Sequence, residues 1–129
     1  MSGVTTALPV GFSTIVLTLA REPGHPIGDQ GIGYEIVAPL GSDGHIDAEQ
    51  WRAHRTLCRV VRFRRNETPD VGHLVRRPGG SWAFRYDVLG DEADESGFHF
   101  DDHVFAPGEY VTVTEDGSQH TYKVASVKN

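Results

Sequence analysis

The stretch from Glu109 to Val127 reads EYVTVTEDGSQHTYKVASV, and it decides the fold. Apolar and polar residues alternate on both sides of Asp116-Gly117, a dipeptide typical of the two-residue turn that joins antiparallel strands. The β-branched and aromatic residues that flank this turn favour strands. This part of the chain is therefore predicted to form a β-hairpin, with strands at Glu109–Thr114 and Gln119–Val127.

A two-residue turn also sets the register of the hairpin, because pairing must begin at the residues beside the turn. Thr114 should face Gln119, and Val111 should face Tyr122. The buried face of the hairpin would then carry Val111, Val113, Tyr122 and Val124. The same alternation places Glu109 on the inward side, where we expect a carboxylate at the mouth of a barrel.

Short apolar or alternating runs indicate further strands along the chain. They lie at Phe12–Ala20, Tyr34–Ala38, Thr56–Phe63, His73–Arg77, Ser81–Val88, Phe98–Phe100 and Val104–Ala106. Two loops are expected between them, a glycine-rich one at Arg21–Gly33 and an acidic one at Gly90–Gly97. About seven short strands with one helix favour a small antiparallel barrel or rolled sheet over a sandwich. Residues 1–129 are expected to form a single domain.

One helix is predicted, from Ala48 to His54. Asp47 precedes it as an N-cap, and Gln50 follows three residues later, as in a capping box. Ile46 and Trp51 occupy the two positions of a hydrophobic staple, which gives a second and independent signal for the same start.

The composition is that of a globular protein with an acidic balance. The 129 residues include 12 Lys and Arg against 18 Asp and Glu, a formal net charge of -6. No apolar run is long enough to span a membrane, and the first residues lack the basic start of a signal peptide. Cys58 has no second cysteine to pair with, which is typical of a reducing compartment. We expect a cytoplasmic protein.

Charge is strongly segregated along the chain. Residues 51–86 contain nine arginines and two acids, a net charge of +7, whereas residues 87–122 contain ten acids and neither Lys nor Arg. Arginine suits planar, bidentate partners such as phosphates and carboxylates. The candidate surface for an anionic ligand or partner consists of Arg59, Arg62, Arg64, Arg65, Arg76 and Arg77.

The alternative is internal pairing, in which basic strands lie beside acidic ones. A pI near 5.5 argues against nucleic acid as the partner, and the aromatic residues Trp82, Phe84 and Tyr86 are expected to be core rather than a stacking surface. The leading hypothesis is a non-catalytic binding or interaction module for a small anionic ligand or a protein, without a cofactor.

A second hypothesis rests on His99, Asp101 and His103, which would share one face of an extended chain. Imidazole and carboxylate ligands suit divalent metals. Together with Pro107, Gly108 and Glu109, the two histidines resemble the metal motif of the cupin barrel, in which the histidines are one residue apart and a Glu follows. That resemblance implies a metal-dependent barrel enzyme acting on a small molecule.

A third hypothesis comes from the motif Phe-x-x-Gly-Gln-Tyr-Val of the flavin-binding barrel in ferredoxin-reductase-like proteins. The chain resembles it at Phe105, Gly108, Tyr110 and Val111. Tyr122 matches the tyrosine of that family's second motif, Arg-x-Tyr-Ser, although His120 and Lys123 stand where the family has Arg and Ser. The resemblance implies a flavin-type barrel.

Overall fold

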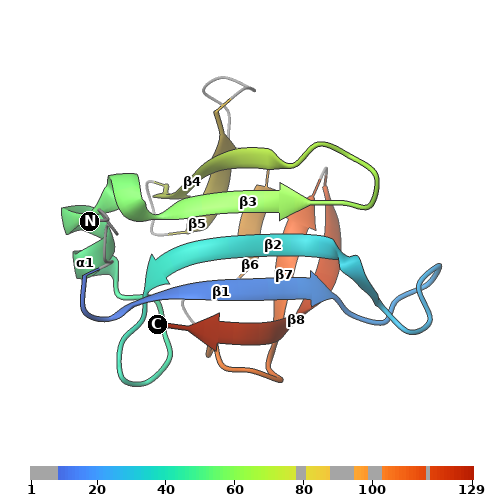
Figure 1. The fold of residues 1–129 in the computed structure, drawn as a ribbon, viewed down its shortest axis with the longest axis horizontal. Helices are drawn as coiled ribbons and strands as arrows, with labels where there is room; N and C mark the ends of the chain where they lie inside the picture. The colour runs from blue at the N-terminus through green and yellow to red at the C-terminus, as the bar shows by residue number, and fades with distance from the viewer. Residues whose placement is uncertain (1–8, 78–80, 88–94, 99–102, 116) are drawn as a thin grey trace, which may run out of the picture.

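The computed structural model describes residues 9–77, 81–87, 95–98, 103–115 and 117–129. Within these ranges, eight antiparallel strands close into a barrel in simple up-and-down order (Figure 1). The strands are β1 (Phe12–Leu19), β2 (Asp29–Pro39), β3 (Arg59–Phe63), β4 (Asp70–Arg76), β5 (Trp82–Tyr86), β6 (Glu95–Phe98), β7 (Tyr110–Glu115) and β8 (Ser118–Lys128). The expected small antiparallel barrel with one short helix is confirmed.

The C-terminal hairpin has the predicted register. Thr114 faces Gln119, and Val111 faces Tyr122. The four residues assigned to its inner face are all buried, and they are Val111, Val113, Tyr122 and Val124. Glu109 lies just before β7, and its carbonyl accepts from the Val124 amide at 2.8 Å, as the register requires. Its side chain is exposed, and whether it belongs to the barrel mouth stays a prediction.

Closure of the barrel depends on β1, which pairs with β2 along one edge and with β8 along the other. Each of these two pairings contains a register shift, between Thr18 and Leu19 on the β2 side and between Val16 and Leu17 on the β8 side. Such bulges bend a strand and increase its twist. β1 can therefore bridge the first and last parts of the chain.

The glycine-rich stretch expected to be a loop through Gly33 is partly a strand, because β2 already begins at Asp29. Gly33 pairs with Thr18 on one side and Phe63 on the other. A Cβ at this position would lie 1.8 Å from the Leu17 carbonyl oxygen. Glycine is thus required here by the close approach of β1, and not by a turn.

Several other boundaries differ from expectation, and β4, for example, begins at Asp70 and not at His73. Residues 104–106 contain no strand; the backbone there is held by the Phe105 amide, which donates to the Gly44 carbonyl, and the Phe105 side chain is buried. The segment before β3 forms a 3-10 turn at Arg55–Leu57. β6 occupies Glu95–Phe98, inside the stretch expected to be an acidic loop, and the remaining predicted strand residues 99 and 100 lie outside the described ranges.

The helix α1 (Ala48–Ala53) begins as predicted, with the Asp47 carboxylate accepting from the amides of Glu49 and Gln50. It lies at the end of the barrel where β1 begins and β2 ends (Figure 1). Trp51 anchors the helix there. Its ring packs edge-on against Trp82 with centroids 5.3 Å apart, and its indole N–H donates to the Leu74 carbonyl at 2.9 Å.

A carboxylate lies in the barrel interior. Glu115 is two residues beyond Val113 on the inward face of β7, and it is only 9% exposed. The hydroxyl of Tyr34 donates to its Oε2 at 2.5 Å, and the hydroxyl of Tyr122 donates to the same oxygen. Arg64 reaches Oε1 at 3.4 Å. This cluster links β2, β7 and β8 to the end of β3, and it satisfies a charge that would otherwise be costly to bury.

We expect Tyr34→Phe and Tyr122→Phe each to lower the free energy of unfolding by about 1.5–3 kcal/mol, because each removes a hydrogen bond to a buried charged group. Tyr110→Phe is the matched control. Tyr110 lies at the start of the same hairpin but is 56% exposed, so its loss of a hydroxyl should change stability by less than about 0.5 kcal/mol. Urea unfolding measures all three, and equal effects at the three tyrosines would contradict this role for Glu115.

Candidate functional site

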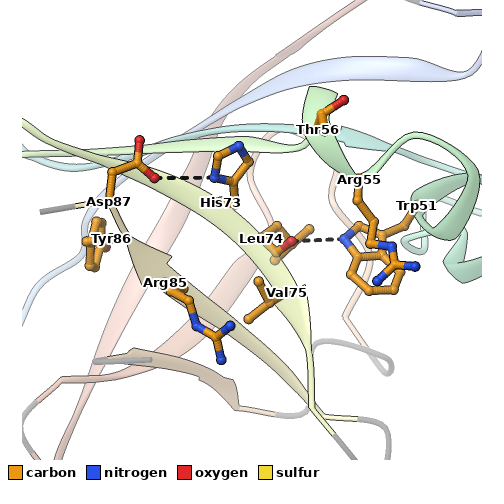
Figure 2. A pocket seen from close by; sticks show the side chains of 9 residues that line it. All are labelled: Trp51, Arg55, Thr56, His73, Leu74, Val75, Arg85, Tyr86 and Asp87. Carbon is orange, nitrogen blue, oxygen red and sulfur yellow. Dashed lines mark hydrogen bonds and ion pairs between the residues drawn. The ribbon is translucent and has the colours of Figure 1, made fainter. Parts of the chain in front are cut away.

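A pocket of about 320 Å³ lies against the outer side of the barrel, between the helical segment and the β4–β5 hairpin (Figure 2). Its volume is within the range of small-molecule sites. The lining comes from three places in the chain, namely Trp51, Arg55 and Thr56; His73, Leu74 and Val75; and Arg85, Tyr86 and Asp87. Every one of these residues is in a described part of the chain.

The floor of the pocket is formed by core residues. Leu74 and Tyr86 are 1% and 2% exposed and belong to the inward face of their strands, and Trp51 is 6% exposed. The Trp51 indole N–H donates to the Leu74 carbonyl (Figure 2). The floor therefore offers little surface to a ligand, and the side chains that a ligand can reach are those on the outer face of the sheet.

Two guanidinium groups flank this floor. Arg85 is exposed on β5, and Arg55 lies with its guanidinium carbon 5.4 Å from the centroid of the Trp51 ring. Within the described residues, neither arginine forms an ion pair with a carboxylate. Figure 2 shows the two side chains on either side of Val75. Both positive charges are thus available to a ligand.

The third polar group in the pocket is an engaged histidine. His73 Nδ1 lies 3.4 Å from Asp87 Oδ1, and Arg59 Nη1 lies 3.0 Å from His73 Nε2. Because arginine can only donate, Nε2 must accept, which assigns the ring proton to Nδ1, facing Asp87. Arg59 also reaches Asp87 at 3.3 Å. Both ring nitrogens of His73 have partners, so this residue is poorly placed to transfer protons. The negative charge of Asp87 is balanced by Arg59 and by the Nδ1 proton of His73.

The six arginines proposed from the sequence do not all meet at this pocket. Arg59 contacts His73 and Asp87, and Arg62 lies over the Tyr86 ring at 5.0 Å while it also pairs with Asp70. The other four arginines have contacts elsewhere, which join Arg64 to Glu115, Arg65 to Asp29, Arg76 to the Trp82 ring and the Arg77 amide to the Ser81 carbonyl.

Four of these six arginines contact a carboxylate within the described residues, which is the arrangement expected from internal pairing. The partners of Arg59 and Arg64 come from the acidic segment, but those of Arg62 and Arg65 do not. Asp29 shows the effect of such contacts. Its pKa is lowered chiefly because the Gly31 amide donates to it at 2.8 Å, and Arg65 adds to this effect. Whether these arginines bind a ligand stays a prediction.

Sequence reasoning missed the two arginines that flank the pocket, although each has a signal. Arg55 follows Trp51 by four residues, the spacing that places two side chains on one face of a helix. Arg85 lies between Phe84 and Tyr86, and these two residues were assigned to the core. Alternation along a strand should therefore have placed Arg85 on the outer face.

The other two hypotheses can be followed only in part. Residues 99 and 101 of the proposed metal set lie outside the described ranges, and only His103 is within them. Among the residues described, no three His, Cys, Asp or Glu side chains are grouped so as to hold a metal ion. Of the residues that resemble a flavin motif, Phe105 and Val111 are buried and Tyr110 is exposed. Both hypotheses stay predictions.

Comparison with protein-family models, with curated proteins and with solved structures finds no match. In the described part of the chain, no helix has the length and apolar character needed to span a membrane. The argument for function therefore rests on the pocket and its side chains.

The single cysteine of the sequence, Cys58, does not line the pocket. It lies between the 3-10 turn and β3 and is fully buried, and burial raises the pKa of its thiol to about 12. The thiolate is the reactive form. This residue is consequently a core side chain and not a nucleophile.

We expect native Cys58 to react with iodoacetamide at pH 8 far more slowly than the same cysteine in the guanidinium-unfolded chain, since burial raises the pKa of its thiol to about 12 and keeps it in the unreactive protonated form. The same shift should weaken the fold as the pH rises from 9 towards 12, because the unfolded chain loses this proton first. Mass spectrometry of the alkylated protein over time gives both rates. Comparable rates in the native and unfolded states would contradict the burial.

Proposed function

We propose that this chain is a non-catalytic module that binds a small anionic ligand in the pocket between α1, β4 and β5. The observation that carries the proposal is the pair Arg55 and Arg85, two arginines that line one pocket without a carboxylate partner in the described residues. Guanidinium groups match carboxylate and phosphate geometry and remain charged at all physiological pH values.

Local charge supports the same function. Asp87 is the one carboxylate among the pocket-lining residues, and it is held by Arg59 and His73. It therefore offers limited repulsion to an incoming anion. The protein as a whole is acidic, with a formal charge of -6. Long-range attraction cannot concentrate anions on it, so binding should depend on short-range contacts within the pocket.

The engaged state of His73 supports binding rather than catalysis. A general base needs a ring nitrogen within reach of the proton it removes, and both nitrogens of His73 already have partners. We place this function in the cytoplasm, because the single buried thiol has no disulfide partner and is typical of a reducing compartment.

The test is a titration of the protein with inorganic phosphate at low ionic strength, measured by isothermal titration calorimetry. We expect Arg85→Ser and Arg55→Ser each to weaken phosphate binding about tenfold or more, since a hydrogen bond to a charged group contributes about 1.5–3 kcal/mol and 1.4 kcal/mol is a factor of ten. Arg65→Ser is the matched control, because Arg65 is an equally exposed arginine on the barrel that does not line the pocket.

The outcomes separate two sites. Loss of binding in the two pocket variants with the control unchanged supports the pocket. Loss in Arg65→Ser, with the pocket variants unchanged, would move the ligand to the arginine surface predicted from the sequence, of which Arg65 is a member, and would overturn the proposal. Binding that survives all three substitutions would overturn it as well.

A further inference from the structure

The two cations of the pocket come from opposite sides of one strand. Arg55 belongs to the 3-10 turn that leads into β3, and β3 pairs with one edge of β4. Arg85 is on β5, which pairs with the other edge of β4. Because neighbouring strands lie about 4.8 Å apart, the two side chains start from backbone positions about 10 Å apart. Figure 2 shows them on either side of Val75, a residue of β4.

A ligand can reach each guanidinium where it lies. Both arginines are exposed, and neither has a carboxylate partner within the described residues. Arg55 rests against the Trp51 ring, with its guanidinium carbon 5.4 Å from the ring centroid, a contact that favours this position of the side chain. One small anion can bind to both arginines only if Arg55 leaves the ring. A ligand with two separate anionic groups can meet both without that movement.

The surface between the two cations is aliphatic. Val75 is half-buried and points to the outer face of the sheet, because its neighbour Leu74 is buried on the inner face. A ligand that joins the two cations has to cross this side chain. A hydrocarbon spacer crosses it without leaving a polar group unsatisfied against it.

We infer that the ligand of this pocket is a dicarboxylate with a short aliphatic spacer, which places one carboxylate at Arg55 and the other at Arg85. This inference rests on the proposed function and adds the ligand class to it. A guanidinium binds a carboxylate in planar, bidentate geometry. Two carboxylates also balance the charge of two arginines. Two phosphate groups would bring a charge of about -1.5 to -2 each to a chain whose formal charge is already -6.

The experiment compares three five-carbon acids by isothermal titration calorimetry at pH 7.5 and low ionic strength. Glutarate carries its two carboxylates at the ends of the chain, ethylmalonate carries both on one carbon, and pentanoate has a single carboxylate. We expect glutarate to bind at least about tenfold more tightly than either of the others, because only glutarate can meet both arginines and a further hydrogen bond to a charged group accounts for such a factor. Equal affinities for glutarate and ethylmalonate would overturn the inference, because total charge and not the spacing of the carboxylates would then determine binding.

Substitution of either arginine tests the two-point contact. Arg55→Ser and Arg85→Ser should each abolish the preference for glutarate over pentanoate, because each leaves one cation for one carboxylate. Arg65→Ser is the matched control, since Arg65 does not line the pocket, and it should keep the preference. A preference for glutarate that survives either pocket substitution would contradict the placement of one carboxylate at each arginine.

Failure of this inference is distinguishable from failure of the proposed function. If the three acids bind equally and their binding depends on Arg55 and Arg85, the anion pocket stands and the dicarboxylate is wrong. If neither the acids nor phosphate depend on these two arginines, the proposed function fails and the inference fails with it.

Discussion

Pairing of β1 with β8 is the constraint on which the rest of the structure depends. It joins the two ends of an eight-stranded meander, so that β1 has a partner on both edges. An exposed edge would present unpaired backbone groups to other chains, and closure removes that liability. Closure also forces inward-facing side chains into a narrow interior, where eight strands leave room for side chains or for one small ligand.

The interior is filled by large side chains. Tyr34, Phe84 and Trp82 are at most 1% exposed, and the Tyr34 ring contacts those of Phe84 and Tyr122 at centroid distances of 5.0 and 5.1 Å. Glu115 joins them because Tyr hydroxyls and Arg64 satisfy its oxygens. The binding site that we propose lies on the outside of this filled barrel, in the pocket between the helical segment, β4 and β5.

The sequence predicted the parts of the fold that local chemistry controls. The Asp116-Gly117 dipeptide predicted the register of the last hairpin, and Asp47 predicted the start of the helix. The sequence could not predict the features that depend on contacts between distant segments. From the sequence alone Gly33 resembles a loop glycine, because the Leu17 carbonyl that lies against it comes from a distant strand. Glu115 follows the alternation of Val111 and Val113, yet a buried carboxylate is acceptable only once both tyrosines converge on it.

The candidate site illustrates the same division. The segregation of charge along the chain predicted either a basic surface or internal ion pairs. In the structure, four of the six candidate arginines form ion pairs with carboxylates. The pocket arginines were missed as a pair because the 3-10 turn that carries Arg55 and the strand β5 that carries Arg85 are distant in sequence. What brings Arg55 near Arg85 is the docking of Trp51 on Leu74 and Trp82, a tertiary contact that no local pattern contains.

The central claim is that ligand binds outside the barrel, beneath the helical segment. An amide and arginine side-chain NMR titration of the uniformly labelled chain with inorganic phosphate tests it most directly, because it reports every site at once. The account predicts saturable shifts confined to signals of Arg55, Thr56, Val75 and Arg85, with those of Arg64 and Arg65 unchanged. Shifts centred on Arg64 and Arg65, or spread evenly over the barrel without saturation, would contradict it.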